Sequence, residues 1–371
     1  MKYRIFLFIL LTFFGFLFTQ QIVNPDQPEK GEWSFSPQKA WETDHADTDI
    51  LVNIIAIRID QQGKIFILNS KLNRVHVFNS LGKFLFSFAR KGEGPGEIKQ
   101  AWGLFVIENR VIIPDTNKIH YFSKEGKYIE SLPTPTMSLS YLFLDQHRVV
   151  AIPFYSFQKE QREVVLYDLK EESKKLLFRI PKVKALRYSG ENIRLMLRMP
   201  FEAAEELLMV KRAEEIWYGY NNTYRIQRLS LNPKDSMSFS IQGRGRKEIS
   251  RKNKHALFER VADNNSQLPN NVLNALSNQI PDQMPYFHYL FTDRLGRFLV
   301  LRASPVKSNS RNVDVFSSMG KYLYRGSIRI DPEYSILQLA LRNGNLVVFV
   351  EDLDGERKLV KYTLNMPDSK S

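Results

Sequence analysis

The chain of 371 residues contains no cysteine. This absence excludes disulfide bonds, thiolate metal ligands, thiol nucleophiles and the acylated cysteine of a lipoprotein. Long apolar runs are also missing after residue 18, because no later stretch approaches the roughly 20 residues of a membrane-spanning helix. Stability must therefore come from burial of apolar side chains, either in one large core or in two ordinary domains.

The one pronounced apolar run lies at the N-terminus, where Lys2 and Arg4 precede residues 5–18. This run is short for a membrane span and typical of a secretory signal, but no small-x-small cleavage motif follows it. We therefore expect residues 1–20 to be a signal peptide or an uncleaved N-terminal anchor. Residues 21–371 are then expected to be exported to the periplasm or cell envelope.

A complete phosphate-binding loop is absent as well. The stretch GEGPG at 92–96 begins like the dinucleotide motif G-x-G-x-x-G, but Glu97 stands at the third position and Gly96 comes one residue early. Two acidic residues, Glu93 and Glu97, would oppose a phosphate. Clusters of glycine and proline favour turns, so we interpret this stretch as a turn in which Glu97 accepts a backbone N–H.

An internal repeat gives the sequence its organisation. Residues 73–76 (NRVH) align with 117–120 (NKIH), and the Gly-Lys pair at 82–83 aligns with the one at 126–127. Fainter copies follow, and a short apolar segment precedes each one. The six copies are residues 60–88, 108–132, 147–180, 214–241, 294–328 and 342–364. Strands of this length separated by Gly/Asn/Asp turns predict an all-β, six-bladed β-propeller with four-stranded blades.

The last copy stops after its third strand. Residues 32–44 offer an unassigned strand, and we predict that this N-terminal strand closes the last blade and leaves no free sheet edge. Two segments break the repeat, at about residues 182–205 and 243–285, and we expect both to be insertions on the rim. The second should be partly helical, because residues 272–280 place their apolar side chains on one helical face and residues 251–261 form a second helix candidate.

The stretch FNSLGKFLFSFARKGEGPGEIKQAWGLFV (78–106) resembles an exported six-bladed β-propeller family of bacteria, related to NHL-repeat and TolB-like propellers. The stretch PDQMPYFHYLFTDRLGRFLVL (281–301) is similar to a later signature of that family. Many of its members look like lipoproteins, from which this chain departs by lacking cysteine. The resemblance implies the fold, but no catalytic residues, since most members have no assigned activity.

The net charge of +13 is concentrated in two windows. Residues 174–198 contain eight Lys/Arg against one acid, and residues 244–260 contain seven against two. A solvated face is one interpretation. The other is a surface that docks an anionic envelope component or an acidic partner protein, since export argues against nucleic acid. The candidate binding residues are Arg244, Arg246, Lys247, Arg251, Lys252, Lys182, Lys184 and Arg187.

Candidate chemistry is sparse. His76 and His120 occupy equivalent repeat positions, which predicts packing or a hydrogen bond inside a blade, and the other histidines (His45, His147, His255 and His288) show no metal-ligand spacing. Four aspartates near strand ends are predicted to cap turns, namely Asp60, Asp115, Asp145 and Asp293. The leading hypothesis is a non-enzymatic binding or scaffold module with no metal or other cofactor. The alternative is a metal-dependent hydrolase or lyase, similar to lactonases, acting in the central channel.

Overall fold

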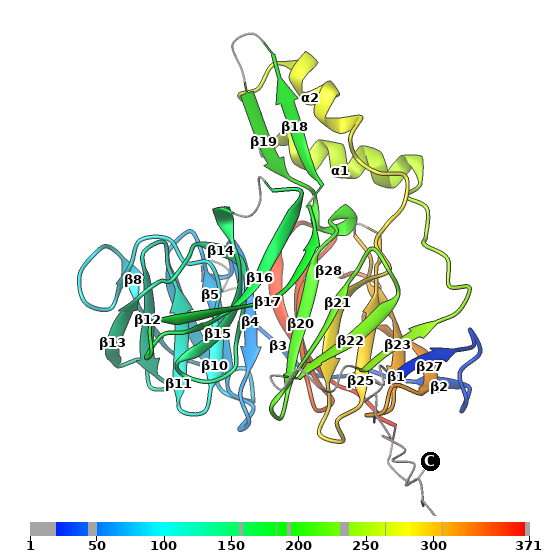
Figure 1. Ribbon diagram of the computed structural model, residues 1–371, viewed down its shortest axis with the longest axis horizontal. Coiled ribbons are helices and arrows are strands. Elements are labelled where there is room, and N and C mark those ends of the chain that lie inside the picture. Colours follow the sequence, from blue (N-terminus) through cyan, green and yellow to red (C-terminus); the bar gives the residue numbers. More distant parts are fainter. Residues whose placement is uncertain are drawn as a thin grey trace, which may run out of the picture.

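Six antiparallel sheets follow one another along the chain and stand around a common axis (Figure 1). The computed structural model describes residues 20–43, 50–155, 159–182, 184–190, 194–230, 237–263, 265–305 and 307–367. The predicted signal segment and His45 lie outside the described residues. The prediction of an all-β, six-bladed propeller is confirmed.

Each blade begins with the strand nearest the axis. Blade 1 contains β4 (Ile54–Ile59), β5 (Ile65–Asn69), β6 (Arg74–Phe78) and β7 (Phe84–Phe88); blade 2 contains β10 (Phe105–Ile107), β11 (Arg110–Pro114), β12 (Lys118–Ser123) and β13 (Tyr128–Pro133). Blade 3 contains β14 (Ser138–Phe143), β15 (Arg148–Pro153), β16 (Gln161–Asp168) and β17 (Ser173–Pro181); blade 4 contains β20 (Leu207–Arg212), β21 (Glu215–Tyr220), β22 (Arg225–Ser230) and β23 (Met237–Ile241). Blade 5 contains β24 (Phe287–Thr292), β25 (Phe298–Arg302), β26 (Ser310–Phe316) and β27 (Tyr322–Arg329); blade 6 contains β28 (Ser335–Arg342), β29 (Asn345–Glu351) and β30 (Arg357–Thr363).

The second strand of each blade is an almost unbroken apolar run, as in residues 65–68, 111–113 and 149–152. All of these residues are buried, because neighbouring blades cover both faces of the strand. The core therefore lies between adjacent sheets. Between blades 1 and 2, for example, Phe66, Leu68 and Val77 share one apolar cluster with Leu104 and Val111.

The N-terminal segment runs around the outside of three blades. Strand β1 (Gln20–Asn24) pairs in parallel with β23, β2 (Glu32–Ser34) pairs in parallel with β27, and β3 (Gln38–Glu42) pairs antiparallel with β30. Strand β3 is thus the fourth strand of blade 6, as predicted, whereas the fifth strands of blades 4 and 5 were not foreseen. We call residues 20–43 the belt.

Three side chains fasten the belt. Asn24 donates to the carbonyl of Gly320 (2.9 Å) and accepts the N–H of Tyr322 (2.8 Å), while the ring of Phe35 is fully buried between blades 5 and 6. The indole of Trp41 donates to the carbonyl of Ser80 (3.0 Å) and joins blade 6 to blade 1. A Cβ atom added to Gly82 would come within 2.6 Å of the Trp41 ring. The backbone of Gly82 also has a φ of +84°, which side chains disfavour, so this repeat position requires glycine.

The stretch GEGPG forms the predicted turn and lies in the crossover from β7 of blade 1 to β10 of blade 2. The carboxylate of Glu97 accepts the N–H groups of Glu93 (3.1 Å) and Gly94 (2.9 Å), and Arg90 donates to its other oxygen (2.7 Å). Two short strands, β8 (Arg90–Lys91) and β9 (Glu97–Ile98), pair across the turn. The protein's own carboxylate therefore takes the N–H groups that a phosphate would need.

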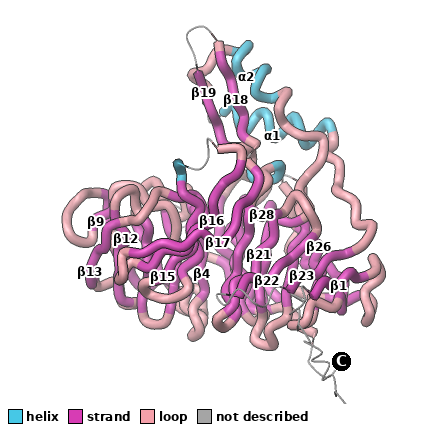
Figure 2. Tube along the Cα trace, in the orientation of Figure 1, coloured by secondary structure: helices cyan, strands magenta, loops and turns pink. Residues whose placement is uncertain are grey.

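The two insertions merge into one module, which we call the cap (Figure 2). The first forms the hairpin of β18 (Ala185–Ser189) and β19 (Arg194–Arg198) followed by the short 3-10 helix η3 (Phe201–Ala203), and the second forms helices α1 (Arg251–Asp263) and α2 (Asn270–Ser277). The cap projects from one face of the ring (Figure 1). In the described part of the chain, no helix has the length and apolar character needed to cross a bilayer.

Deleting residues 22–45 should lower the melting temperature by more than about 10 °C, because it removes a strand from three blades and exposes the edge of β30. The variant Phe35→Ala tests the packing of the belt against blades 5 and 6 in a milder form, and we expect it to lower the free energy of unfolding by about 3–5 kcal/mol. Thermal and urea unfolding measure both effects. Unchanged melting of the deletion variant would contradict the closure.

Candidate functional site: the cap, its pocket and the central channel

The cap has its own apolar core. Leu186 from the hairpin packs with Leu257, Val261, Val272 and Leu276 from the two helices. The side-chain amide of Gln279 joins the two insertions, because it accepts the N–H of Arg187 (2.8 Å) and donates to the carbonyl of the same residue (2.7 Å). The cap therefore presents its surface as one unit.

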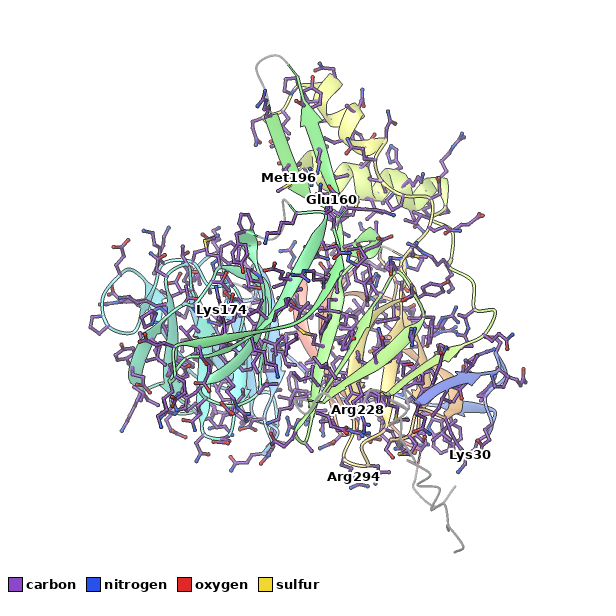
Figure 3. All side chains as sticks on the ribbon, in the orientation of Figure 1. Lys30, Glu160, Lys174, Met196, Arg228 and Arg294 are labelled. Carbon is purple, nitrogen blue, oxygen red and sulfur yellow. The ribbon has the colours of Figure 1, made fainter. Side chains whose placement is uncertain are left out.

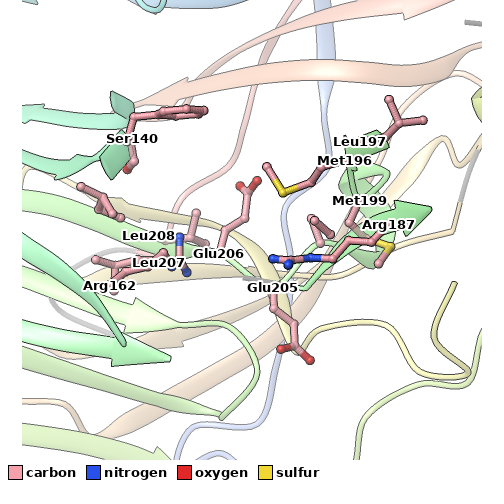
Figure 4. Close-up of a pocket in the computed structure, with 14 residues that line it drawn as sticks. Ser140, Arg162, Arg187, Met196, Leu197, Met199, Glu205, Glu206, Leu207 and Leu208 are labelled. Carbon is pink, nitrogen blue, oxygen red and sulfur yellow. The ribbon is translucent and has the colours of Figure 1, made fainter. Parts of the chain in front are cut away.

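A pocket of about 330 Å³ lies where the hairpin meets blades 3 and 4 (Figure 4). Most of its wall is apolar, with contributions from Ile152 on β15, Met196 and Leu197 on β19, and Leu207 and Leu208 on β20. The side chain of Met196 is half exposed. A concave apolar wall with few polar groups is the usual form of a small-molecule site.

Charged groups stand at this apolar wall. Arg162 and Arg187 enter from opposite sides with their guanidinium groups toward the middle of the pocket (Figure 4). The carboxylate of Glu205, by contrast, is engaged by Lys184 (3.1 Å) and Arg246 (3.5 Å). The Glu205 charge is therefore offset by two cations, and the remaining charged groups of the lining are Arg162, Arg187 and the carboxylate of Glu206.

The structure divides the predicted basic residues into two groups. Arg187, Arg251, Lys252 and Lys247 are exposed on the cap and form no ion pair with the described residues. Lys182, Lys184 and Arg246 are held by carboxylates, Lys182 by Glu160 (2.9 Å) and the other two by Glu205. The window 174–198 is also split, since Lys174 lies on blade 3 and not on the hairpin that carries Met196 (Figure 3).

Arg244 differs from the expectation of an exposed docking residue. Its side chain is 5% exposed and donates to the carboxylates of Asp26 (2.6 Å) and Asp314 (3.0 Å) and to the hydroxyl of Tyr322 (3.3 Å). Burial alone would lower the pKa of Arg244, but the charge of the fully buried Asp314 raises it above its usual value. Arg244 therefore ties the belt to blade 5 and is not open to a ligand.

The central channel is an open cavity of about 750 Å³ along the inner strands of blades 1, 4, 5 and 6. A second cavity of about 690 Å³ lies between the cap and blades 5 and 6 and shares Phe201, His288, Tyr289 and Gln338 with the channel. The channel lining includes the cations Arg58, Lys211, Arg294 and Arg342 but only one acid, Asp293. Sequence reasoning missed this excess, because each cation is a single residue in a different blade.

The two repeat histidines have the predicted structural role. His76 hydrogen-bonds Ser87 (2.7 Å) and His120 hydrogen-bonds Ser131 (2.9 Å), each through Nδ1 to the neighbouring outer strand. Both imidazoles are buried. Burial, together with the charge of Arg74, lowers the pKa of His76 to about 4, so this side chain is neutral at physiological pH.

Three of the four aspartates cap their own turns, as predicted, whereas Asp115 also binds Lys99 and Gln100 of the crossover before blade 2. Oδ1 of Asp60 accepts the N–H groups of Gln62 and Lys64, and Asp145 and Asp293 bind their own turns in the same way. Asp115 accepts three backbone N–H groups at the end of β11 instead. Within the described residues, no group of three or more His, Asp or Glu side chains is placed to hold a metal ion.

Six blades around an open channel, one face of which carries a cap, define a capped six-bladed β-propeller. The chain belongs to the DUF5128 family, described as 6-bladed beta-propeller, whose model matches residues 44–256.

Two solved structures share the fold. A protein from Bacteroides fragilis described as exported is 14% identical, with a TM-score of 0.52 and coverage of 94% of this chain and 99% of that chain. A member of the DUF4221 family from Bacteroides vulgatus is 8% identical, with a TM-score of 0.55 and coverage of 91% and 99%. At this identity the likeness establishes the fold alone. No curated protein matches the chain.

Replacing Arg244 by alanine should lower the free energy of unfolding by about 3–5 kcal/mol, because the buried carboxylate of Asp314 loses its cationic partner. The exposed Arg251→Ala on the cap is the matched control and should change stability by less than about 0.5 kcal/mol. Urea unfolding measures both. Equal stability of the two variants would show that Arg244 does not tie the belt to blade 5.

The lowered pKa of His76 also predicts how the stability of the protein depends on pH. An unfolded histidine takes up a proton near pH 6.5 but folded His76 only near pH 4, so stability should fall as pH drops from 6.5 to 4. The contribution is about 3 kcal/mol. The His76→Gln variant should lose that part of the acid sensitivity when unfolding is measured at pH 7.5 and pH 4.5. Parallel pH profiles for the variant and the original chain would contradict the assignment.

Proposed function

We propose that the protein is a binding module outside the cytoplasm whose cap engages an anionic amphiphile, such as an acidic lipid of the bacterial envelope. The observation that carries the proposal is the apolar pocket at the base of the cap, with Arg187 at its wall. The pocket suits a hydrocarbon segment, and the arginine suits an acidic head group. A location outside the cytoplasm is supported by the basic and apolar N-terminus and by the exported neighbour.

The surface of the cap supports the same chemistry. Arg251 and Lys252 stand at the start of α1, exposed to solvent and without an ion pair among the described residues. Exposed cations and exposed apolar side chains such as Met196 on one module are the combination found in proteins that bind anionic membrane surfaces. No observation in the described chain favours the metal-dependent hydrolase or lyase.

The charge-reversal variant Arg187→Glu/Arg251→Glu/Lys252→Glu should bind vesicles of phosphatidylglycerol more than about 100-fold more weakly than the original chain, since each basic residue near such a surface contributes about 1 kcal/mol. Co-sedimentation with vesicles at 0.05 and 0.3 M salt measures the loss. The matched control is Lys174→Glu/Lys175→Glu/Lys321→Glu, which reverses three exposed cations at or beside turns between the third and fourth strands of blades 3 and 5, on the face of the ring away from the cap. An equal loss in the control, or no loss in the cap variant, would overturn the proposal.

The pocket is tested separately. Met196→Asp should weaken the binding that persists at high salt, because it places a charge in the apolar wall. Met319→Asp is the control, because Met319 is similarly exposed but lies in the turn between β26 and β27. If both variants bind like the original chain, the pocket does not take the hydrocarbon segment.

A further inference from the structure

The four cations of the channel gather at the mouth that lies opposite the cap. In each of blades 1–5, four consecutive strands form an antiparallel meander, so each chain crossover from the fourth strand to the next inner strand falls on the same face of the ring. Both insertions are such crossovers, which places the cap where inner strands begin. Arg58, Lys211 and Arg342 occupy the other end of β4, β20 and β28, and Arg294 follows the end of β24.

Two of these arginines have no acidic partner among the described residues. Arg58 donates only to the carbonyl of Ile57 (2.8 Å), and its guanidinium lies 5.5 Å from the centre of the Phe105 ring. Arg342 reaches the carbonyl of Ile59 at 3.5 Å, and its Nε is buried with no hydrogen-bond partner. Both guanidinium groups therefore bind carbonyl groups of β4, and both keep N–H donors that have no partner among the described residues.

The nearby charges do not neutralise this mouth. Lys211 donates to the carbonyl of Leu144 and lies 3.9 Å from Glu214, while Arg294 is exposed. The carboxylate of Asp293 is held by Arg297 (2.7 Å) and by its own turn. The end of the channel is therefore positive, and its electrostatic potential should be focused by the surrounding low-dielectric walls.

Retaining unpaired cations in a partly dehydrated channel is costly. Burial lowers the pKa of Arg58 to about 10, yet leaves the guanidinium charged at neutral pH. A charge removed from water without a partner destabilises a fold, so a fold that keeps two of them together is expected to use them. Guanidinium groups offer planar pairs of donors that match the oxygens of carboxylate and phosphate.

We propose that this mouth of the channel is a binding site for an oxyanion, the phosphate or carboxylate group of a small molecule. Arg58 and Arg342 donate to the anion, and Lys211 and Arg294 contribute to its attraction. The rest of the molecule lies along the apolar inner strands, against side chains such as Ile57, Leu339 and Leu341. This site is separate from the cap, so it holds whether or not the cap binds an amphiphile.

Isothermal titration with inorganic phosphate and with citrate, in a buffer free of both, tests the site. The original chain should bind at least one of the two anions saturably, with affinity that falls as salt rises. The Arg58→Gln/Arg342→Gln variant should bind at least about 10-fold more weakly, whereas Arg329→Gln, an exposed arginine on β27, should bind like the original chain. The comparison of phosphate with citrate identifies which oxyanion is preferred.

A second readout distinguishes a binding site from a structural one. Without added anion, the double variant should melt at the same temperature as the original chain or higher, because two unpaired cations have been removed. The anion should raise the melting temperature of the original chain but not of the double variant. A lower melting temperature of the variant without anion, equal binding by both proteins, or no binding by the original chain would each overturn the proposal.

Discussion

The pairing of β3 with β30 is the interaction on which the ring depends. A propeller is a closed series of sheets, and each sheet packs only against its two neighbours, so the first and last blades must be fastened to each other. Here the fastening uses the backbone hydrogen bonds of β3 and the indole of Trp41, which reaches the turn of blade 1. The same interaction leaves blade 6 with four strands and covers its outer edge.

The belt also explains why Arg244, which was predicted to be an exposed docking residue, is not open to a ligand. Arg244 follows blade 4, but its guanidinium turns inward to Asp314 of blade 5 and reaches Asp26 of the belt. One side chain thus connects two blades and the N-terminal segment, close to the start of the insertion that builds the cap. Neighbours in the chain therefore differ in exposure, since the side chain of Arg244 is internal and that of Arg251 faces solvent.

The repeat was sufficient to predict the ring, because each blade carries its own turns and apolar strands. The aligned pairs His76/His120 and Gly82/Gly126 therefore predicted equivalent positions correctly. Helix α2 was predicted from apolar periodicity, and α1 was named as a second helix candidate. The union of the two insertions could not be predicted, because the contact between Gln279 and Arg187 joins segments that no local pattern relates. The pocket and the cations of the channel could not be predicted for the same reason. The wall of the pocket comes from two blades and a hairpin, and the cations come from four blades. An arginine within an apolar strand, as at Arg58 in IIAIRI, was the one local sign.

The belt has a consequence for the order of events during synthesis. Residues 38–42 precede all six blades in the chain, whereas their partners in β30 belong to the sixth blade. Native pairing of this strand therefore spans nearly the whole polypeptide, and contacts of such large sequence separation form slowly. Blades 1–3 contain no belt strand and can assemble before the later blades are made, but the ring itself can be completed only once β30 is available to pair with β3. Closure is thus a late step of folding, and until it occurs β30 presents an unpaired edge.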